Sequence, residues 1–391
     1  MKPLKYLFIS SMLFVATSCG NSWLDLEPST SVDTETSIKI LSDVEFTLNG
    51  IYSTMQSSDA YSGRLVYYGD VTGDDMQAVS STKRVANYYR FNFTKDDNPS
   101  SHWSYLYSII QNCNLILMNI DKLVIDEDDK AYRDDLKGEA LAIRGLALFD
   151  LTRIFGYPYL KDNGASLGVP IIEGLSTIDS KPTRNTVAQC YTKIIDDLTQ
   201  SLSLLGEKFN KGKINKWGAM VLLSRVYLYK GENANALKMA SDAIIGAEKN
   251  KYALWTNEDY PTAWGEDASA SKPGEVLFEI VNLTTDSPGK ESMGYLNSYD
   301  GYDDMCITCS FYQFLKEDPK DIRLKLLSFD KKYYAYVNKY QPQREENIED
   351  ANIPLIRLSE AYLNAAEAAV KENDNDAAVK YLDPIVKRAN P

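Results

Sequence analysis

Aromatic and hydrogen-bonding side chains occur together in two stretches that lack a helical pattern. Residues 250–310 carry the rings of Trp255, Tyr260, Trp264, Tyr295, Tyr299 and Tyr302, next to Asn257, Asp259, Asn297 and Asp300. Residues 57–101 carry Tyr67, Tyr68, Tyr88 and Tyr89, next to Asp74 and Asp75. An aromatic plane can stack on the C–H-rich face of a sugar ring, while amides and carboxylates bind its hydroxyls. The two stretches therefore predict a binding surface, whose candidates are Trp255, Trp264, Tyr260, Tyr295, Tyr299, Tyr302, Asp75 and Tyr89, with Trp255, Trp264, Tyr295 and Tyr299 the strongest.

The excess of tyrosine over phenylalanine supports this prediction for the aromatic residues taken together, but not for each residue by itself. The chain has 27 tyrosines but only 12 phenylalanines, and a ring with a polar edge suits a half-wet surface. Packing in the core is the simpler explanation for any single tyrosine. We expect Trp255 and Trp264 to contact the ligand rather than the core, because Trp264 stands in PTAWGED, where no helix or strand period gives it a core direction.

Few other residues have the types and spacing that catalysis or metal binding needs. The single histidine, His102, excludes HExxH chemistry and His-rich metal sites, and we expect it at a helix start or on the surface. Cys306 and Cys309 form a lone CITC without the further ligands of a zinc site, so a structural or free pair is expected. No carboxylate pair stands out among 55 acidic residues. The sequence predicts no catalytic residue, metal or cofactor.

The N-terminus has the features of an export signal. Lys2 and Lys5 precede an apolar run, residues 7–15, which is too short to span a bilayer. The run leads through small residues to Cys19, an arrangement that resembles a bacterial lipobox, in which the cysteine is lipidated and becomes the mature N-terminus. Ordinary secretory cleavage with an incidental cysteine is the alternative. We expect residues 1–18 to be the signal peptide and residues 19–41 to be a lipidated tether.

Charge restricts the partners. The net charge is −13 and the pI is about 4.8, whereas nucleic acid and anionic lipid surfaces require a basic face. No nucleic-acid partner is therefore expected.

Long amphipathic patterns predict a mainly α scaffold. Val44, Leu48, Ile51 and Met55 form one apolar stripe, after a capping-box spacing at Ser42 and Glu45. Further helices are expected at residues 103–123, 136–155, 187–205, 217–230, 233–247, 356–371 and 376–388.

Two features of these helices suggest layers. Glycines such as Gly138 and Gly145 leave one face of the helix expected at residues 136–155 without side chains at these positions, which indicates close approach by a neighbouring helix. The last two pairs are each joined by a short polar turn, as in a tetratricopeptide repeat.

Seven segments, in order along the chain, resemble the SusD/RagB family of Bacteroidetes outer-membrane lipoproteins. They are Cys19 followed by WLDLEP, WSYLYSIIQNCNLIL, GEALAIRGLALFDLTRIFGYPYL, GVPII, PTRNTVAQCY, INKWGAMVLLSRVYLYKGENANAL and LIRLSEAYLNAAEA. The likeness extends over nearly the whole chain. Family members generally continue beyond the last repeat helix, whereas this chain stops at RANP. Either the protein is a shortened member of the family or the sequence is cut.

The resemblance implies a fold and a function. We expect a single SusD-like domain over residues 42–391, with a tetratricopeptide-like scaffold, little β structure, and irregular inserts at about 57–101 and 250–310. The implied protein is a non-catalytic lipoprotein at the outer membrane, facing the cell exterior, that binds oligosaccharide and delivers it to a SusC-like TonB-dependent transporter. A binder of peptides or other nutrients, a glycosidase with two carboxylates, and a repeat protein that only docks other proteins remain alternatives.

Overall fold

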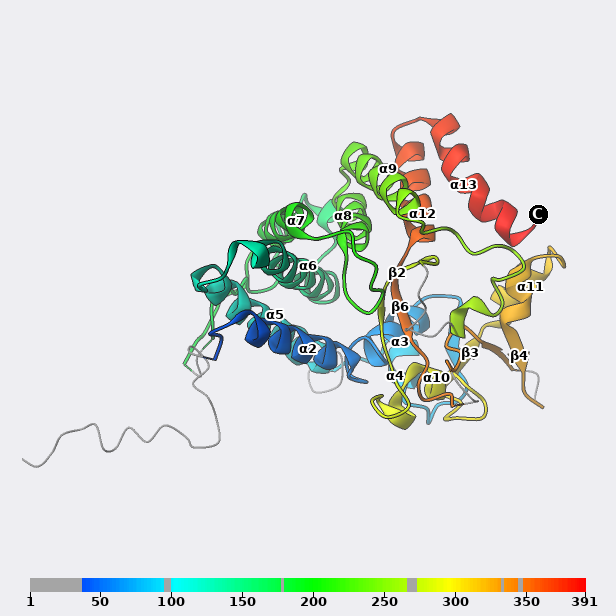
Figure 1. Cartoon of the computed structure of the whole chain (residues 1–391). Helices are drawn as coiled ribbons and strands as arrows, with labels where there is room; N and C mark the ends of the chain where they lie inside the picture. Colours follow the sequence, from blue (N-terminus) through cyan, green and yellow to red (C-terminus); the bar gives the residue numbers. More distant parts are fainter. Residues whose placement is uncertain (1–36, 95–99, 177–178, 266–272, 332–333, 344–346) are drawn as a thin grey trace, which may run out of the picture. The chain divides into compact units, whose positions relative to one another are not determined.

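The computed structural model describes residues 37–94, 100–176, 179–265, 273–331, 334–343 and 347–391 (Figure 1). The chain divides into a short unit, Met1–Lys39, and a large unit, Ile40–Pro391. Only residues 37–39 of the short unit are described. The predicted signal peptide, Cys19 and most of the predicted tether therefore lie outside the described residues.

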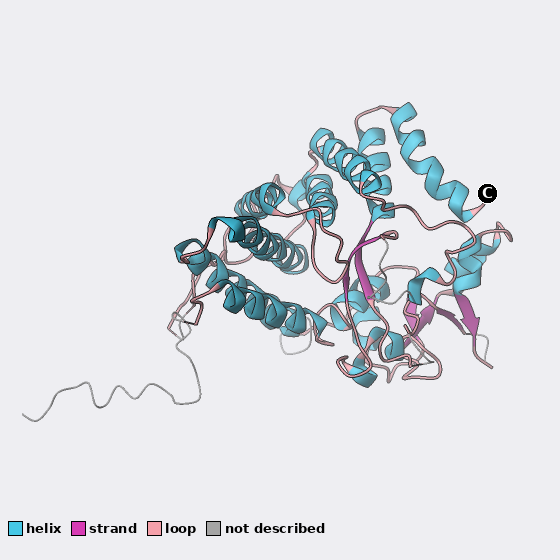
Figure 2. Ribbon diagram, in the orientation of Figure 1, coloured by secondary structure: helices cyan, strands magenta, loops and turns pink. Residues whose placement is uncertain are grey.

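Helices dominate the large unit (Figure 2). The α-helices are α2 (Leu41–Gln56), α3 (Arg64–Val71), α4 (Ala86–Tyr89), α5 (Ser100–Asn119), α6 (Lys130–Phe155), α7 (Val187–Leu204), α8 (Lys216–Lys230), α9 (Asn233–Lys249), α10 (Met293–Leu296), α11 (Cys309–Lys316), α12 (Leu358–Lys371) and α13 (Asn375–Ala389). Short 3₁₀ turns are η3 (Ile120–Lys122), η4 (Glu127–Asp129), η5 (Tyr159–Lys161), η6 (Ala263–Gly265), η7 (Gly289–Glu291) and η8 (Ile322–Leu326). The prediction of a mainly α fold is confirmed.

The strands in the described residues form three antiparallel pairs. They are β1 (Met76–Ala78) with β3 (Met305–Ile307), β2 (Val276–Ile280) with β6 (Ile353–Arg357), and β4 (Leu327–Phe329) with β5 (Ala335–Val337). In the first pair Met76 lies opposite Ile307. Each pair except β4–β5 joins segments that are far apart in the sequence.

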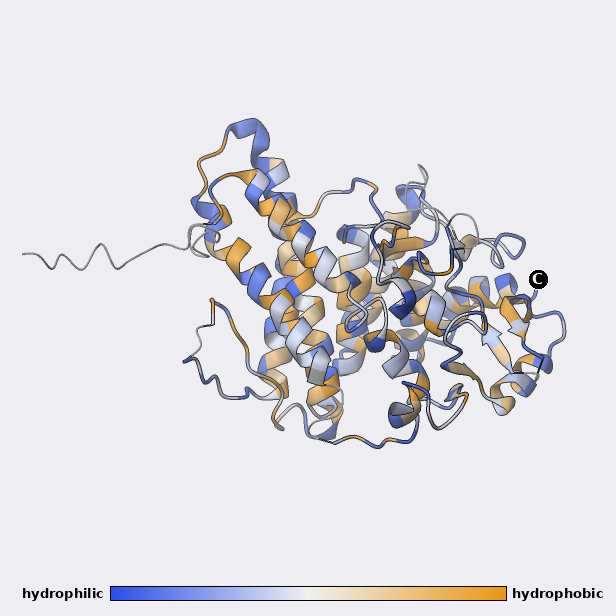
Figure 3. Ribbon diagram, turned by 90° about the horizontal axis from the view of Figure 1, so that it is seen from below, coloured by the Kyte–Doolittle hydropathy of each residue, from blue (hydrophilic) through white to orange (hydrophobic). Residues whose placement is uncertain are grey.

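The long helices pack in chain order. α5 contacts α6, α6 contacts α7, α7 contacts α8, α8 contacts α9, α9 contacts α12, and α12 contacts α13 (Figure 1). Hydrophobic and hydrophilic segments alternate along these helices (Figure 3), as amphipathic helices in a layered array require. The predicted stripe of α2 is confirmed, since Val44, Leu48, Ile51 and Met55 are all fully buried.

The glycines of α6 allow the close approach that their pattern predicts. A Cβ at Gly138 would lie 2.9 Å from Leu205 Cγ and 3.0 Å from the Leu205 backbone nitrogen. A Cβ at Gly145 would lie 3.0 Å from Leu198 Cγ. Leu198 belongs to α7 and Leu205 directly follows it, so these two glycines fix the α6–α7 spacing.

Two details differ from the sequence-based expectation. α2 begins at Leu41, where the carboxylate of Asp43 accepts a hydrogen bond from the backbone of Ile40 at 3.0 Å, so the predicted capping box at Ser42 is wrong. The stretch 57–101 is also less irregular than expected, because it contains α3, β1 and α4. Short helices with few turns lack the long period on which sequence reading depends.

A buried carboxylate holds the end of the helical stack to the loop region. Glu275 is fully buried, and its side chain accepts hydrogen bonds from Arg357 at 2.8 Å, Arg388 at 2.5 Å and the backbone of Trp255 at 3.0 Å. Its carbonyl oxygen accepts from the backbone of Leu358 at 2.8 Å. One residue thereby links β2, β6, α12, α13 and the segment before η6.

We expect Gly138→Ala to lower stability, because its methyl group would collide with the backbone of Leu205. Overpacking of this kind costs about 1–3 kcal/mol. Gly50→Ala in α2 is the matched control: it meets no atom within 4 Å and should gain up to about 1 kcal/mol from helix propensity. Denaturant midpoints of the two variants and the wild type measure the difference. Equal stability of the two variants would contradict the close approach of α6 and α7.

Candidate functional site

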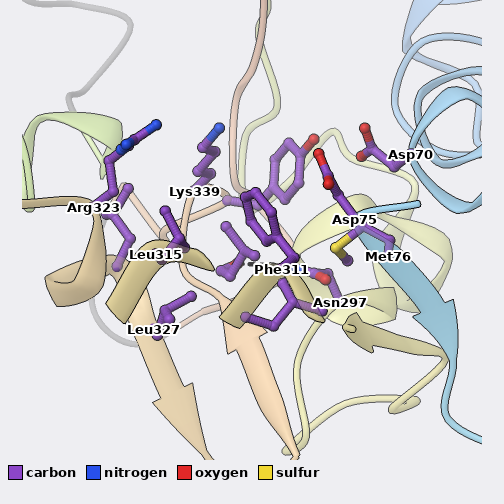
Figure 4. A pocket seen from close by; sticks show the side chains of 13 residues that line it. Asp70, Asp75, Met76, Asn297, Phe311, Leu315, Arg323, Leu327 and Lys339 are labelled. Atoms are coloured by element: carbon purple, nitrogen blue, oxygen red, sulfur yellow. Dashed lines mark hydrogen bonds between the residues drawn. The ribbon is translucent and has the colours of Figure 1, made fainter. Parts of the chain in front are cut away.

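A pocket of about 220 Å³ opens where β1, β3, α11, η8 and the β4–β5 pair meet (Figure 4). Its lining residues are Asp70, Asp75, Met76, Asn297, Ile307, Phe311, Leu315, Arg323, Leu326, Leu327, Val337, Lys339 and Tyr340. Pockets that enclose a whole small ligand usually measure about 300–1,000 Å³. This volume therefore suits one unit of a longer molecule that continues into solvent.

Helix α11 supplies an aromatic and an aliphatic wall. Thr308 caps the helix, because its hydroxyl accepts a hydrogen bond from the backbone of Phe311 at 3.3 Å. The backbone of Thr308 donates to the carbonyl oxygen of Asp75 at 2.9 Å, which ties the helix start to β1. Phe311 and Leu315 lie one turn apart and both line the pocket.

Asn297 supplies a polar group with unused capacity. It is 5% exposed, and its amide nitrogen donates to the carbonyl oxygen of Val337 at 2.6 Å. Its amide oxygen has no hydrogen-bond partner among the described residues. A buried acceptor without a partner costs about 1–3 kcal/mol, so a donor from a ligand would relieve that cost.

Opposite charges face each other across the pocket. Arg323 and Lys339 rise from one side, and Asp70 and Asp75 lie at the other (Figure 4). Burial, and secondarily the charge of Arg357, lowers the pKa of Lys339 to about 8. Burial also raises the pKa of Asp70, an effect that nearby Lys339 opposes. The pocket thus combines an aromatic wall, an amide and charged groups of both signs.

A second hollow of about 320 Å³ adjoins the pocket. Asn297, Val337 and Tyr340 line both hollows. The further lining residues of the second are Gly294, Ser298, Asn338, Gln341, Pro342 and Ile348. A ligand longer than one unit could therefore extend past Asn297.

Three of the predicted ligand residues lie in the core. Trp255, Tyr260 and Trp264 are only 5–6% exposed and pack with Ile322 and Leu326. The two indole rings meet edge to face at 5.0 Å, and Tyr260 meets Trp264 at 5.6 Å. The expectation that the two tryptophans lie outside the core is wrong, because residues distant in sequence provide the core contact that their local sequence does not reveal.

Cations cover the faces of this aromatic cluster. The Arg357 guanidinium lies 4.7 Å from the ring centre of Trp264, and the Lys339 ammonium lies 5.2 Å from it. Arg388 lies 4.7 Å from the ring centre of Tyr260. These distances are in the range of cation–π attraction. Lys339 therefore connects the two regions, because it contacts the aromatic cluster and also lines the pocket.

The remaining predicted tyrosines lie outside the pocket lining. Tyr295 and Tyr302 are partly buried and meet edge to face at 5.0 Å, with Arg84 3.8 Å from the ring centre of Tyr302. Tyr299 is 46% exposed and Tyr89 is 39% exposed. Tyr299 and Tyr89 stay predicted ligand contacts, which only a ligand longer than the pocket would reach.

Asp75 is the predicted candidate that does line the pocket. Phe311, Arg323, Lys339 and Tyr340 also line the pocket but were not predicted, because they follow the two stretches of clustered rings. The runs FYQFL and KKYYAYVNKY carry the missed signal, since each mixes rings with polar or basic residues.

His102 and the cysteine pair do not line the pocket. His102 is 1% exposed, not on the surface, and its Nδ1 lies 3.1 Å from the carbonyl oxygen of Asp59. Burial lowers the pKa of His102. No disulfide joins Cys306, which is buried, to Cys309, which is exposed. In the described part of the chain, no three His, Cys, Asp or Glu side chains form a group that could hold a metal ion.

A helical-repeat scaffold that carries a small pocket of mixed polarity is typical of a binding protein, and the comparisons identify the family. The family model described as "Starch-binding associating with outer membrane" matches residues 22–228, and the model of the SusD family matches residues 326–391. The chain belongs to the SusD family.

Similar proteins have the same fold over most of the chain. A Bacteroides vulgatus protein of known crystal structure is 82% identical, with a TM-score of 0.89 over 91% of this chain and 80% of that one. A SusD superfamily protein from Bacteroides thetaiotaomicron is 37% identical, with a TM-score of 0.83 over 90% of this chain and 81% of that one. SusD-like protein P2 of Formosa agariphila is 28% identical over 77% of this chain and 57% of its own length. The chain thus spans little more than half of that relative.

None of the helices among the described residues combines the length and apolar character needed to cross a bilayer.

We expect Trp264→Ala to destabilise the fold by about 3–5 kcal/mol, because it would leave a large cavity beside Trp255 and Ile322. Tyr299→Ala is the control, since that ring is nearly half exposed and its loss should change stability far less. Thermal or denaturant unfolding measures both. If Trp264→Ala left the unfolding midpoint unchanged, the aromatic cluster would not be core.

Proposed function

We propose that this protein is a non-catalytic lipoprotein of the outer membrane that binds oligosaccharide at the pocket of Asp75, Asn297 and Phe311 and delivers it to a TonB-dependent transporter. The observation that carries the binding proposal is the unpartnered amide oxygen of Asn297 beside an aromatic wall. Family membership supports it, because the matching family description is one of starch binding.

The chemistry of a sugar fits each part of this pocket. The C–H face of a pyranose can pack on Phe311, and a hydroxyl can donate to the amide oxygen of Asn297. Asp75 is exposed at the rim, where a carboxylate accepts hydrogen bonds from hydroxyls. The adjoining hollow, which also includes Tyr340, would receive the next unit of the chain.

One observation favours a second candidate, a glycosidase. Asp70 and Asp75 line the same pocket, and the charge of Asp75 contributes, after burial, to raising the pKa of Asp70. Two carboxyl groups in one pocket, one of them with a raised pKa, are the groups that a glycosidase uses as its acid and its partner. Chromatography after prolonged incubation with a bound oligosaccharide separates the two candidates, because a binding protein returns the ligand uncleaved.

The anchor and the transporter are proposals from the sequence and the family. Cys19, at the end of the apolar run, would carry the lipid, and the acylated N-terminus would keep the domain at the membrane. Stacked helices present extended surfaces that suit docking on a large partner.

We expect Phe311→Ala to weaken oligosaccharide binding about tenfold, because stacking and the buried ring area are lost together. Phe314→Ala is the matched control: it removes the same ring one turn later on α11, where the ring is 61% exposed and outside the pocket. Calorimetric titration with oligosaccharides found by glycan array measures both variants. Equal binding by the two variants would remove the pocket from the proposal.

We expect Cys19→Ala to move the protein from the membrane fraction to the soluble fraction, because attachment depends on the acyl chains. Immunoblots of fractionated cells measure this, with the unmutated protein as control.

Mild detergent extracts of the wild-type membranes should also contain a TonB-dependent barrel that co-purifies with the protein. Membrane recovery that did not change, or a lipoprotein isolated alone, would contradict the anchor or the partnership respectively.

A further inference from the structure

Lys339 differs from the arginines around it in lacking a carboxylate partner. Arg357 and Arg388 share Glu275, at 2.8 Å and 2.5 Å. Arg323 forms a forked pair with Asp321 in which its Nε lies 2.9 Å and 3.0 Å from the two carboxylate oxygens. Among the described residues, by contrast, no carboxylate oxygen lies within ion-pair distance of the Lys339 ammonium.

The position of Lys339 makes this lack costly. Its side chain is partly buried, and burial with the charges of Arg357, Arg323 and Arg388 disfavours its protonated form, while Asp70 favours it. A cation taken out of water without a close partner is destabilising. An anion that entered the pocket beside Lys339 would supply the missing partner, with Arg323 at the same wall.

The opposite wall limits how much negative charge the ligand can carry. Asp70 and Asp75 lie across the pocket from Lys339 (Figure 4), and the whole chain has a net charge of −13. Like charges in the same pocket repel. The carboxylates suit neutral hydroxyls, so a ligand with a charge on every unit would be repelled where a singly charged one would not.

We propose that the pocket selects an oligosaccharide with one acidic substituent, a carboxylate or a sulfate, which pairs with Lys339 while the neighbouring sugars are neutral. The inference rests on the proposed function, because it specifies the ligand of the same pocket.

A glycan array with matched ligands tests the inference. Neutral oligosaccharides of different linkage are printed beside the same chains with one uronate, with one sulfate, and with a uronate on every unit. We expect one of the singly charged forms to bind at least about tenfold tighter than its neutral counterpart, and the uronate and sulfate arms show which acid is preferred. The fully charged chains should bind more weakly than the singly charged ones.

Variants of one lysine at a time identify the group that is responsible. Lys339→Gln should abolish the preference for the singly charged ligand, and Lys339→Arg should retain most of it. Lys325→Gln, which removes the same charge from an exposed side chain of η8 outside the pocket, should leave the preference unchanged. Circular dichroism and unfolding midpoints check that the variants fold.

The outcomes separate the two proposals. Binding of neutral chains that equals or exceeds that of the charged ones overturns the inference and leaves oligosaccharide binding intact. A preference that survives in Lys339→Gln, or that is lost equally in Lys325→Gln, also overturns it, since the effect would then come from general charge. Binding of no glycan at all overturns the proposed function and the inference with it.

Discussion

The pairing of one fully buried carboxylate connects the helical stack to the region that forms the pocket. Glu275 cannot be solvated, so its charge depends on the guanidinium groups of Arg357 and Arg388 and on the backbone of Trp255. Removal of one member of such a buried set typically costs about 3–5 kcal/mol, because the remaining charge is left without a partner. The same two arginines cover the aromatic rings behind Lys339, so the helical scaffold and the electrostatics of the pocket share their charged groups.

The helical scaffold could be predicted from the sequence because each long helix has its own periodic pattern of apolar residues. The stripe of Val44, Leu48, Ile51 and Met55 repeats at helical spacing, and all four side chains are buried as that spacing requires. Gly138 likewise signalled close packing, because a glycine in a helix interior needs a compensating reason. Such local patterns determine which face of a helix is covered.

The pocket was harder to predict, since its walls depend on contacts between distant segments. Trp264 has no periodic neighbours, but Ile322 and Leu326 cover its ring and place it in the core. Phe311 and Lys339 belong to segments whose local composition gives no sign that they meet. Asp75, one of the predicted residues, lines the pocket because it directly precedes β1, which pairs with β3. Its role in ligand binding stays a prediction, and no local pattern reveals the pairing that places it there.

The pairing of β1 with β3 also affects when the pocket forms during folding. Met76 meets Ile307 across more than half of the chain, and both side chains line the pocket. Contacts between such distant residues carry a large loop-closure entropy and tend to form late in folding. Partly folded chains that already contain the stack of helices would therefore lack the pocket. A ligand that binds only the completed pocket draws the folding equilibrium toward the native state, so the concentration of ligand would change the folded population as well as the occupancy of the pocket.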